Sequence, residues 1–169
     1  KIIEFAAGLL KNGYQIIATG NTAKVLAENK IDVTEISSIT GFPEIFDGRV
    51  KTLHPKIFGG ILFRRDNDHD KKQAAENHIE AIDIVCVNLY PFVKTVSNPN
   101  SKLDDIIENI DIGGPSLVRA SAKNYKFVSI LTDPDQYDLF IEELNAGKIS
   151  DQTRKKLAVA AYSHTANYD

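Results

Sequence analysis

Short β-prone runs alternate with amphipathic helical stretches along this chain of 169 residues. The β-prone runs lie at 14–19, 31–36, 82–89 and 127–131, and the helical stretches include 2–10, 22–28, 115–123, 137–144 and 152–164. Strands that are separated by helices favour right-handed crossovers, and these give a mostly parallel sheet with helices on both faces. The sequence therefore predicts an α/β fold with three layers, α/β/α.

The length and composition favour one domain, since 43% of the residues are hydrophobic and 25% are charged. No apolar run approaches the roughly 20 residues of a membrane span. The single cysteine, Cys86, lies in an apolar run, which predicts a buried thiol in a reducing compartment such as the cytoplasm. The chain contains no methionine and opens directly into a helical pattern. We therefore expect residues 1–169 to be one domain that lacks its first strand.

The charge of the chain is weakly negative overall but basic in one window. The net charge is -3 and the sequence pI is about 5.8, which argues against a general nucleic-acid or membrane surface. Residues 46–65 nevertheless hold several cations against Asp47 alone. Arg49 and Lys51 would share one face of an extended backbone. This window predicts a site for a small anionic ligand.

The first segment that follows a predicted strand contains Thr19, Gly20 and Thr22. Ligands of parallel α/β folds bind at the carboxyl ends of strands, and the free N–H groups of a helix amino end suit a phosphate. An ordinary turn that is capped by Asn21 or Thr22 explains the same residues. Local sequence leaves both interpretations open.

Two further segments hold candidate catalytic residues. Tyr90 follows the apolar run 82–89 and could bind a heterocycle or simply pack at the sheet edge. Asp111 precedes a glycine pair and could act on a ligand or cap the helix 115–123. Lys123 ends that helix, where a cation is favourable without any function. About 12 Å of helix rise separates Pro115 from Lys123, so Asp111 and Lys123 could share only a long ligand.

Other site classes lack support in the sequence. His54, beside Pro55, is more often structural than catalytic, and the remaining histidines have no metal spacing, so we predict no metal site. The chain has no Gly-x-Ser-x-Gly elbow, no full Walker loop and no dinucleotide fingerprint. The sequence therefore does not favour a hydrolase with a nucleophile elbow, an ATPase with a Walker loop or a dehydrogenase with a dinucleotide fingerprint.

Six motifs follow one another over nearly the whole chain. They are Gly-Phe-Pro-Glu at 41–44, Gly-Arg-Val-Lys-Thr-Leu-His-Pro-Lys at 48–56, Gly-Gly-Ile-Leu at 59–62, Asn-Leu-Tyr-Pro-Phe at 88–92, Asp-Ile-Gly-Gly at 111–114 and Ala-Lys-Asn at 122–124. In this combination the chain resembles the inosine monophosphate (IMP) cyclohydrolase domain of the bifunctional purine biosynthesis enzymes. The resemblance implies a methylglyoxal-synthase-like fold and ring closure of 5-formamidoimidazole-4-carboxamide ribotide (FAICAR) to IMP.

The resemblance also implies residue roles, partners and the absence of a cofactor. The matching catalytic positions are Lys51, Tyr90, Asp111, Lys123 and Arg49. The matching substrate-binding positions are Thr19, Gly20, Thr22, Thr52, Ile112 and Gly113. The family implies a homodimer and fusion to an aminoimidazole carboxamide ribotide (AICAR) formyltransferase domain, which this sequence does not contain. Members of this family also usually begin with a strand and a phosphate-binding loop, which residues 1–169 lack.

Two alternatives from other classes share the expected fold. A non-catalytic nucleotide-binding or effector-binding domain would bind the ligand without turnover. A methylglyoxal-synthase-type lyase would share the phosphate site, but the motifs at 49–55 and 111–114 belong to the cyclohydrolase. The sequence therefore favours the cyclohydrolase over both.

Overall fold

The computed structural model of the chain describes residues 1–89 and 92–169, and its strands form two short parallel pairs. β1 (Ile17–Ala18) pairs with β2 (Thr34–Glu35), with Ile17 opposite Thr34. β3 (Ile84–Cys86) pairs with β4 (Ser129–Leu131), with Val85 opposite Ile130. The parallel pairing confirms the expected α/β fold.

Helices account for most of the regular structure. They are α1 (Ile2–Lys11), α2 (Gly20–Glu28), α3 (Ile36–Thr40), α4 (Pro55–Leu62), α5 (Asp68–Glu76), α6 (Phe92–Val96), α7 (Leu103–Glu108), α8 (Gly113–Lys123), α9 (Tyr137–Asn145) and α10 (Asp151–Tyr168), with a 3₁₀ turn η1 (Pro134–Gln136). Among the described residues, no helix is long and apolar enough to cross a membrane.

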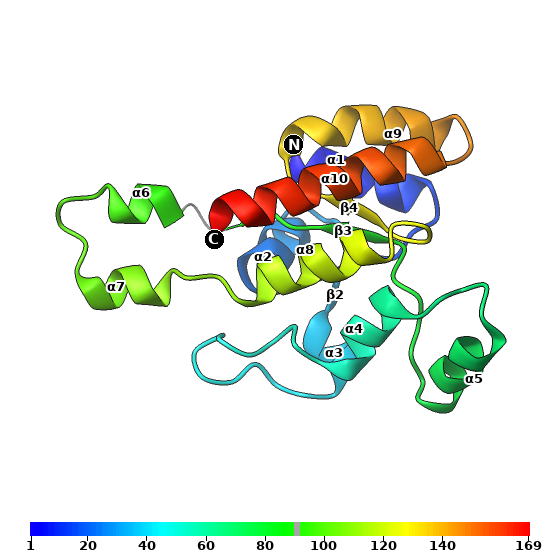
Figure 1. The fold of residues 1–169 in the computed structure, drawn as a ribbon, viewed down its shortest axis with the longest axis horizontal. Helices are drawn as coiled ribbons and strands as arrows, with labels where there is room; N and C mark the ends of the chain where they lie inside the picture. Colours follow the sequence, from blue (N-terminus) through cyan, green and yellow to red (C-terminus); the bar gives the residue numbers. More distant parts are fainter. Residues whose placement is uncertain (90–91) are drawn as a thin grey trace.

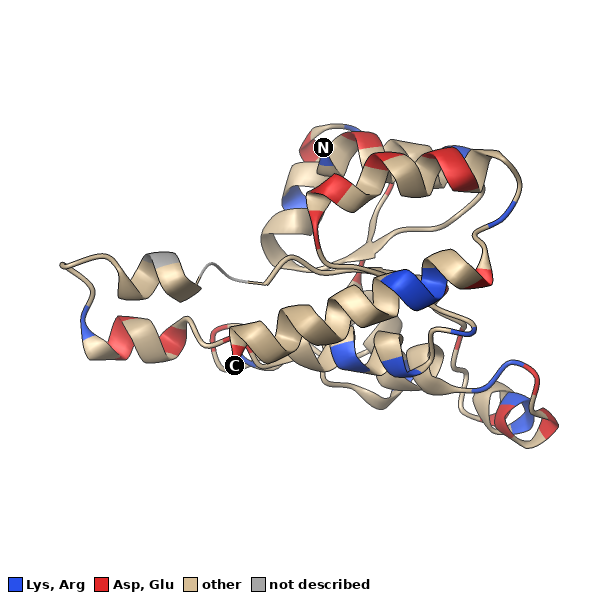
Figure 2. Cartoon of the chain, turned by 45° about the horizontal axis from the view of Figure 1, so that its top comes forward, with Lys and Arg blue, Asp and Glu red and all other residues tan. Residues whose placement is uncertain are grey.

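The helices cover β3 and β4 on two sides and make three layers. α1 and α9 lie side by side on one side, while α8 and α10 run along each other on the other (Figures 1 and 2). The core between them is apolar: Phe5 of α1 stacks on Tyr137 of α9 at 4.4 Å between ring centroids, and Val118 of α8 and Ile130 of β4 are fully buried. Burial of such side chains is the main favourable contribution to folding.

α4 begins inside the basic window, and its start explains His54. Pro55 occupies the first turn, where its missing N–H costs nothing. The His54 Nδ1 atom accepts a hydrogen bond from the Lys56 backbone N–H at 3.1 Å. His54 is therefore a helix cap, in agreement with the structural interpretation of this histidine.

The facing edges of the two sheets have no strand between them in the described part of the chain. In a parallel pair, every second residue of a strand forms its backbone hydrogen bonds with the partner strand. The residues between them direct their N–H and C=O groups away from that partner. Asp83 O accepts from Ser129 N and Val87 N donates to Leu131 O, so the backbone groups of Ile84 and Cys86 point away from β4. This edge of β3 is free to take another strand.

α6 and α7 form an arm that projects from the body of the molecule (Figure 1). The exposed fractions of its apolar side chains are high: 76% for Val93, 69% for Leu103 and 49% for Ile107. The arm leaves the body after Leu89 and returns at Asp111. It is thus rooted between two of the predicted site segments.

Several elements differ from the sequence-based expectations. Each strand is shorter than its β-prone run, and Ile36, expected to end a strand, begins α3. Regular strand forms only where backbone N–H and C=O groups are hydrogen-bonded to a neighbouring strand. The parts of each β-prone run that lack such a neighbour are therefore irregular. Cys86 was expected to be buried but is half-buried, because it lies at the free edge of β3. Burial still raises the pKa of its thiol.

Candidate active site at the amino ends of α2 and α8

The amino end of α2 is open to a ligand. Thr19 precedes the helix in an extended conformation and makes no side-chain cap, so the expected caps, Asn21 and Thr22, lie inside the helix instead. Gly20 begins α2 with a φ of 50°, a left-handed conformation that glycine adopts without strain. The first N–H groups of a helix have no intrahelical partner and carry partial positive charge. This end of α2 therefore suits an anion.

Lys51 adds a full positive charge at the same place. Its Nζ atom lies 3.7 Å from the position that a Cβ atom on Gly20 would take. Its nearest acid is Glu44, at 3.9 Å between Nζ and Oε2, and 28% of the Lys51 side chain is exposed. The ammonium group is thus accessible and is held near the α2 amino end.

The loop before Lys51 is a tight turn, which makes the expectation of extended backbone wrong. Phe46, Asp47 and Gly48 all have left-handed φ values, of 54°, 53° and 90°. An antiparallel bridge between Ile45 and Val50 closes the turn. Arg49 still belongs to this turn, whereas Lys51 follows the bridge residue Val50 in a bend, so the two cations do not share one face of an extended backbone.

Arg49 consequently points to the arm rather than to Lys51. Its Nε atom lies 3.2 Å from both carboxylate oxygens of Glu108 in α7, and its guanidinium also forms an ion pair with that carboxylate. This contact raises the pKa of Arg49 and lowers the pKa of Glu108. Both groups are exposed, so the pair adds little stability. In Figure 2 the red segments of the α7 ribbon mark its acidic residues.

Thr52 connects the basic segment to the amino end of α8. Its Oγ1 atom lies 2.8 Å from the position of a Cβ on Gly113, so a larger residue at 113 would displace it. Ile112, just before the helix, is 60% exposed. Lys51 and Thr52 are adjacent in the chain, and they therefore join the amino ends of α2 and α8 at one site.

Asp111 is fixed at the start of α8. Its Oδ1 atom accepts a hydrogen bond from the Gly114 backbone N–H at 2.8 Å, and its own N–H donates to the Tyr168 hydroxyl at 2.8 Å. A Cβ on Gly114 would lie 2.3 Å from Asp111 Oδ2 and 2.8 Å from Leu89. The capping interpretation of Asp111 is confirmed, and a cap does not prevent the carboxylate from meeting a ligand.

Two predicted catalytic residues are not brought to this cluster by the described structure. Tyr90 lies outside the described residues, although Leu89 before it contacts the start of α8. Lys123 is the last residue of α8, a helix of 11 residues, and so lies about 15 Å along the axis from Gly113. Lys123 is exposed at that end.

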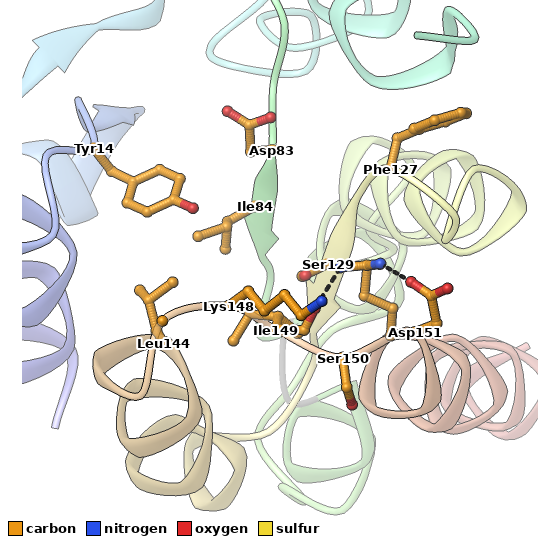
Figure 3. Close-up of a pocket in the computed structure, with 12 residues that line it drawn as sticks. Tyr14, Asp83, Ile84, Phe127, Ser129, Leu144, Lys148, Ile149, Ser150 and Asp151 are labelled. Carbon is orange, nitrogen blue, oxygen red and sulfur yellow. Dashed lines mark hydrogen bonds and ion pairs between the residues drawn. The ribbon is translucent and has the colours of Figure 1, made fainter. Parts of the chain in front are cut away.

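A cavity of about 500 Å³ lies elsewhere, at the amino ends of β3 and β4. Tyr14, which precedes β1, and Ile84 of β3 both line it, and Figure 3 shows the Tyr14 ring directed toward Ile84. The cavity is therefore at the opposite end of β3 and β4 from the candidate site. The described residues contain no group of three or more metal-ligating side chains.

Comparisons with known proteins agree with this geometry. Residues 1–116 match the family model described as the MGS-like domain. The chain belongs to the MGS-like domain family. Residues 121–169 match a second family model, the AICARFT/IMPCHase bienzyme. The MGS-like fold of this chain is thus the three-layer α/β/α arrangement that its sequence predicts.

Curated relatives of this MGS-like chain are longer proteins. The bifunctional purine biosynthesis protein PurH of Persephonella marina is 60% identical over 169 residues, which are 99% of this chain and 33% of that protein. The protein of the same name from Thermoanaerobacter sp. is 56% identical over the same shares. This chain therefore spans about a third of the relatives that it matches.

A solved structure is also similar to this MGS-like chain. It is entitled "Crystal structure of ForH" and has a TM-score of 0.85 and 35% sequence identity. The match covers 99% of this chain and 88% of that one. The likeness thus extends over the whole domain.

Sequence reasoning missed three residues that contact the site. Glu44 and Glu108 pair with Lys51 and Arg49, and Tyr168 bonds to Asp111. Two of these contacts join residues more than 50 positions apart, and no local pattern marks them. Two signals were available: Glu44 lies in the Gly-Phe-Pro-Glu motif, and Tyr168 lies in the run His-Thr-Ala-Asn-Tyr-Asp at 164–169, which also resembles the family.

Proposed function

We propose that this chain is an IMP cyclohydrolase, which closes the purine ring of FAICAR with loss of water. The observation that carries the proposal is the junction at Lys51 and Thr52, which joins the amino ends of two helices beside Asp111. The names of the PurH relatives and the AICARFT/IMPCHase family model support the same activity.

The reaction is intramolecular, so the site need only hold one molecule in the reactive conformation. The carboxamide nitrogen attacks the formyl carbon and forms the new C–N bond, while the C=O electron pair moves to oxygen. The carboxamide nitrogen loses one proton and the formamido nitrogen loses its N–H proton as its C=N bond forms. The former formyl oxygen gains two protons and leaves as water, which gives IMP. The site must move these protons and stabilise the developing oxyanion, and no cofactor is required.

The predicted catalytic residues divide these tasks. Asp111, fixed by Gly114, assists deprotonation of the carboxamide nitrogen, and Lys51 stabilises negative charge. Tyr90 or Lys123 handles the proton on the departing oxygen. The position of Lys123 at the far end of α8 favours Tyr90 for this step. Arg49 remains the fifth predicted catalytic residue, and it would have to release Glu108 before it could contact the substrate.

The predicted binding residues suit the rest of a nucleotide. Thr19, Gly20 and Thr22 at the open end of α2 hold the phosphate, with Lys51 as the nearby cation. Thr52 binds beside them, and the backbone of Ile112 and Gly113 faces the base. A nucleotide is long enough to reach from the amino end of α2 to the amino end of α8.

The proposal is tested by incubating the purified chain with FAICAR and measuring IMP by chromatography against a control without enzyme. Asp111→Asn removes the base but keeps an oxygen that can accept the Gly114 N–H, and we expect kcat to fall about 100-fold. Asp32→Asn, at an exposed position outside the site, should retain wild-type turnover.

Other results would reject the proposal or a part of it. Full turnover by Asp111→Asn would remove Asp111 from the mechanism. Binding of IMP with no turnover by the wild-type chain would leave the non-catalytic binding domain. Formation of methylglyoxal from dihydroxyacetone phosphate would favour the lyase.

We also propose that the chain forms a homodimer through its arm and works in a longer protein with an AICAR formyltransferase. The exposed apolar side chains of α6 and α7 support an interface, because contiguous apolar patches mark contact surfaces. The bifunctional name of the relatives supports the fusion. A cytoplasmic location stays our prediction, and it is supported by the lone, free Cys86.

The free edges of β1 and β3 support one more proposal, that a strand from outside residues 1–169 completes the sheet. The described strands form two separate parallel pairs, β1–β2 and β3–β4, and the backbone groups of Ile84 and Cys86 point away from β4. One added parallel strand would join the pairs into a single sheet with β1 and β3 as its neighbours.

A further inference from the structure

We propose that Tyr168 is a positioning residue that holds Asp111 in place for the cyclohydrolase reaction. The inference rests on the proposed function, and it adds a residue from the last turn of α10 to the site. Tyr168 belongs to none of the predicted catalytic or substrate-binding positions. Its contact with Asp111 joins two segments that lie 57 residues apart.

Two hydrogen bonds fix Asp111, one at its backbone and one at its side chain. The Asp111 backbone N–H donates to Tyr168 Oη at 2.8 Å, and the Asp111 Oδ1 atom accepts from Gly114 N at 2.8 Å. The first bond sets the position of the main chain, and the second sets the rotamer of the side chain. Without Tyr168, the main chain before α8 loses the partner that fixes it from outside the helix.

The tyrosine is itself held firmly enough to do this. It ends α10, a helix of 18 residues that lies along α8 (Figure 1). Thr165 and Ala161, about one and two turns before Tyr168, are buried with at most 1% exposure. The Tyr168 ring also meets Phe92 edge to face, with centroids 6.3 Å apart. Its hydroxyl is therefore presented at a defined place.

Such positioning matters because a general base must lie within hydrogen-bond reach of the proton that it takes. A shift of about 1 Å at Asp111 can cost up to about 100-fold in rate, even though no group in contact with substrate has been removed. A positioning residue is thus expected to act on kcat more than on KM.

The test compares Tyr168→Phe with Tyr162→Phe. Tyr168→Phe keeps the ring against Phe92 and removes only the hydroxyl. Tyr162 lies on the same helix, but its ring faces the Arg119 guanidinium at 5.6 Å, so the matched change there leaves Asp111 untouched. Each variant is assayed for IMP formation from FAICAR, for thermal unfolding, and for amide hydrogen exchange of Asp111 by NMR.

We expect Tyr168→Phe to lower kcat about tenfold with KM changed less than about twofold, the size of effect that one lost hydrogen bond gives. Exchange of the Asp111 amide should become about tenfold faster, because its acceptor is gone. Tyr162→Phe should match the wild type in both readouts. The midpoint of thermal unfolding should stay within a few degrees for both variants.

Three outcomes would overturn the inference. They are wild-type kcat in Tyr168→Phe, unchanged exchange of the Asp111 amide, and an equal loss of kcat in Tyr162→Phe. A wild-type chain that makes no IMP would reject the proposed function instead. In that case the exchange of the Asp111 amide would still decide whether Tyr168 fixes this backbone.

Discussion

Arg49 and Lys51 are two residues apart, yet they have separate surroundings. Arg49 is paired with Glu108 on the arm, whereas Lys51 lies near Gly20 with Glu44 at 3.9 Å. An exposed bidentate pair already occupies the Arg49 guanidinium, while Lys51 can turn its ammonium toward a ligand. Lys51 is therefore the cation of this window that is best placed to bind a phosphate.

We expect Lys51→Gln to weaken binding of IMP about 10- to 100-fold, the range for loss of a charged hydrogen bond. Titration calorimetry measures the change directly. The matched control is Lys24→Gln, because Lys24 lies on α2 itself with 72% of its side chain exposed and pairs only weakly with Glu28. Equal affinities of Lys51→Gln and the wild type would remove Lys51 from the phosphate site.

For single residues, the local sequence predicted which side chains belong to the site better than it predicted which residues those side chains contact. The cap formed by Asp111 was foreseen because it depends on a bond to a residue three positions on. The approach of Thr52 to Gly113 could not be foreseen from local pattern, since it depends on how α4 and α8 pack. The divergence of Arg49 from Lys51 could not be foreseen either, because Arg49 ends a turn in which Phe46 and Asp47 have a left-handed conformation that residues other than glycine seldom adopt.

Among the elements, helix α4 shows why pattern alone was insufficient. The residues before it form an irregular basic segment, and the apolar residues from Ile57 fit a short strand or a buried helix equally well. The chain forms a helix because Pro55 and the His54 cap begin one. The strand runs were located correctly, but their lengths depend on partners that a single sequence does not reveal.

The arm of α6 and α7 carries its own prediction. We expect Leu103→Asp, which puts a charge on a side chain that is 69% exposed, to shift the protein from dimer to monomer in light scattering. The control is Leu139→Asp on α9, where the leucine is 71% exposed but lies away from the arm (Figure 1). A wild-type chain that is already a monomer, or dimers of both variants, would contradict an interface at the arm.

Over the whole molecule, the candidate site joins parts that belong to different sheets. α2 follows β1, and α8 connects β3 to β4, so the two helix ends meet only if the sheets keep their relative placement. In the described residues, the segment around Lys51 and Thr52 links these two parts at the site. A strand between β1 and β3 would fix the placement and with it the distance between the helix ends.

The free edge of β3 makes this dependence measurable by amide hydrogen exchange. The Val87 N–H is bonded to Leu131 O at 3.0 Å, so we expect it to be protected, whereas the N–H groups of Ile84 and Cys86 face away from β4. In residues 1–169 these two amides should exchange at least about tenfold faster than that of Val87, because exchange without a partner needs no opening of the sheet. In a longer protein that supplies a strand at this edge, their protection should rise to that of Val87 while the exchange of exposed loop amides stays unchanged. Equal protection of all three amides in residues 1–169 would mean that the edge is already paired, and the proposed added strand would then have no place between β1 and β3.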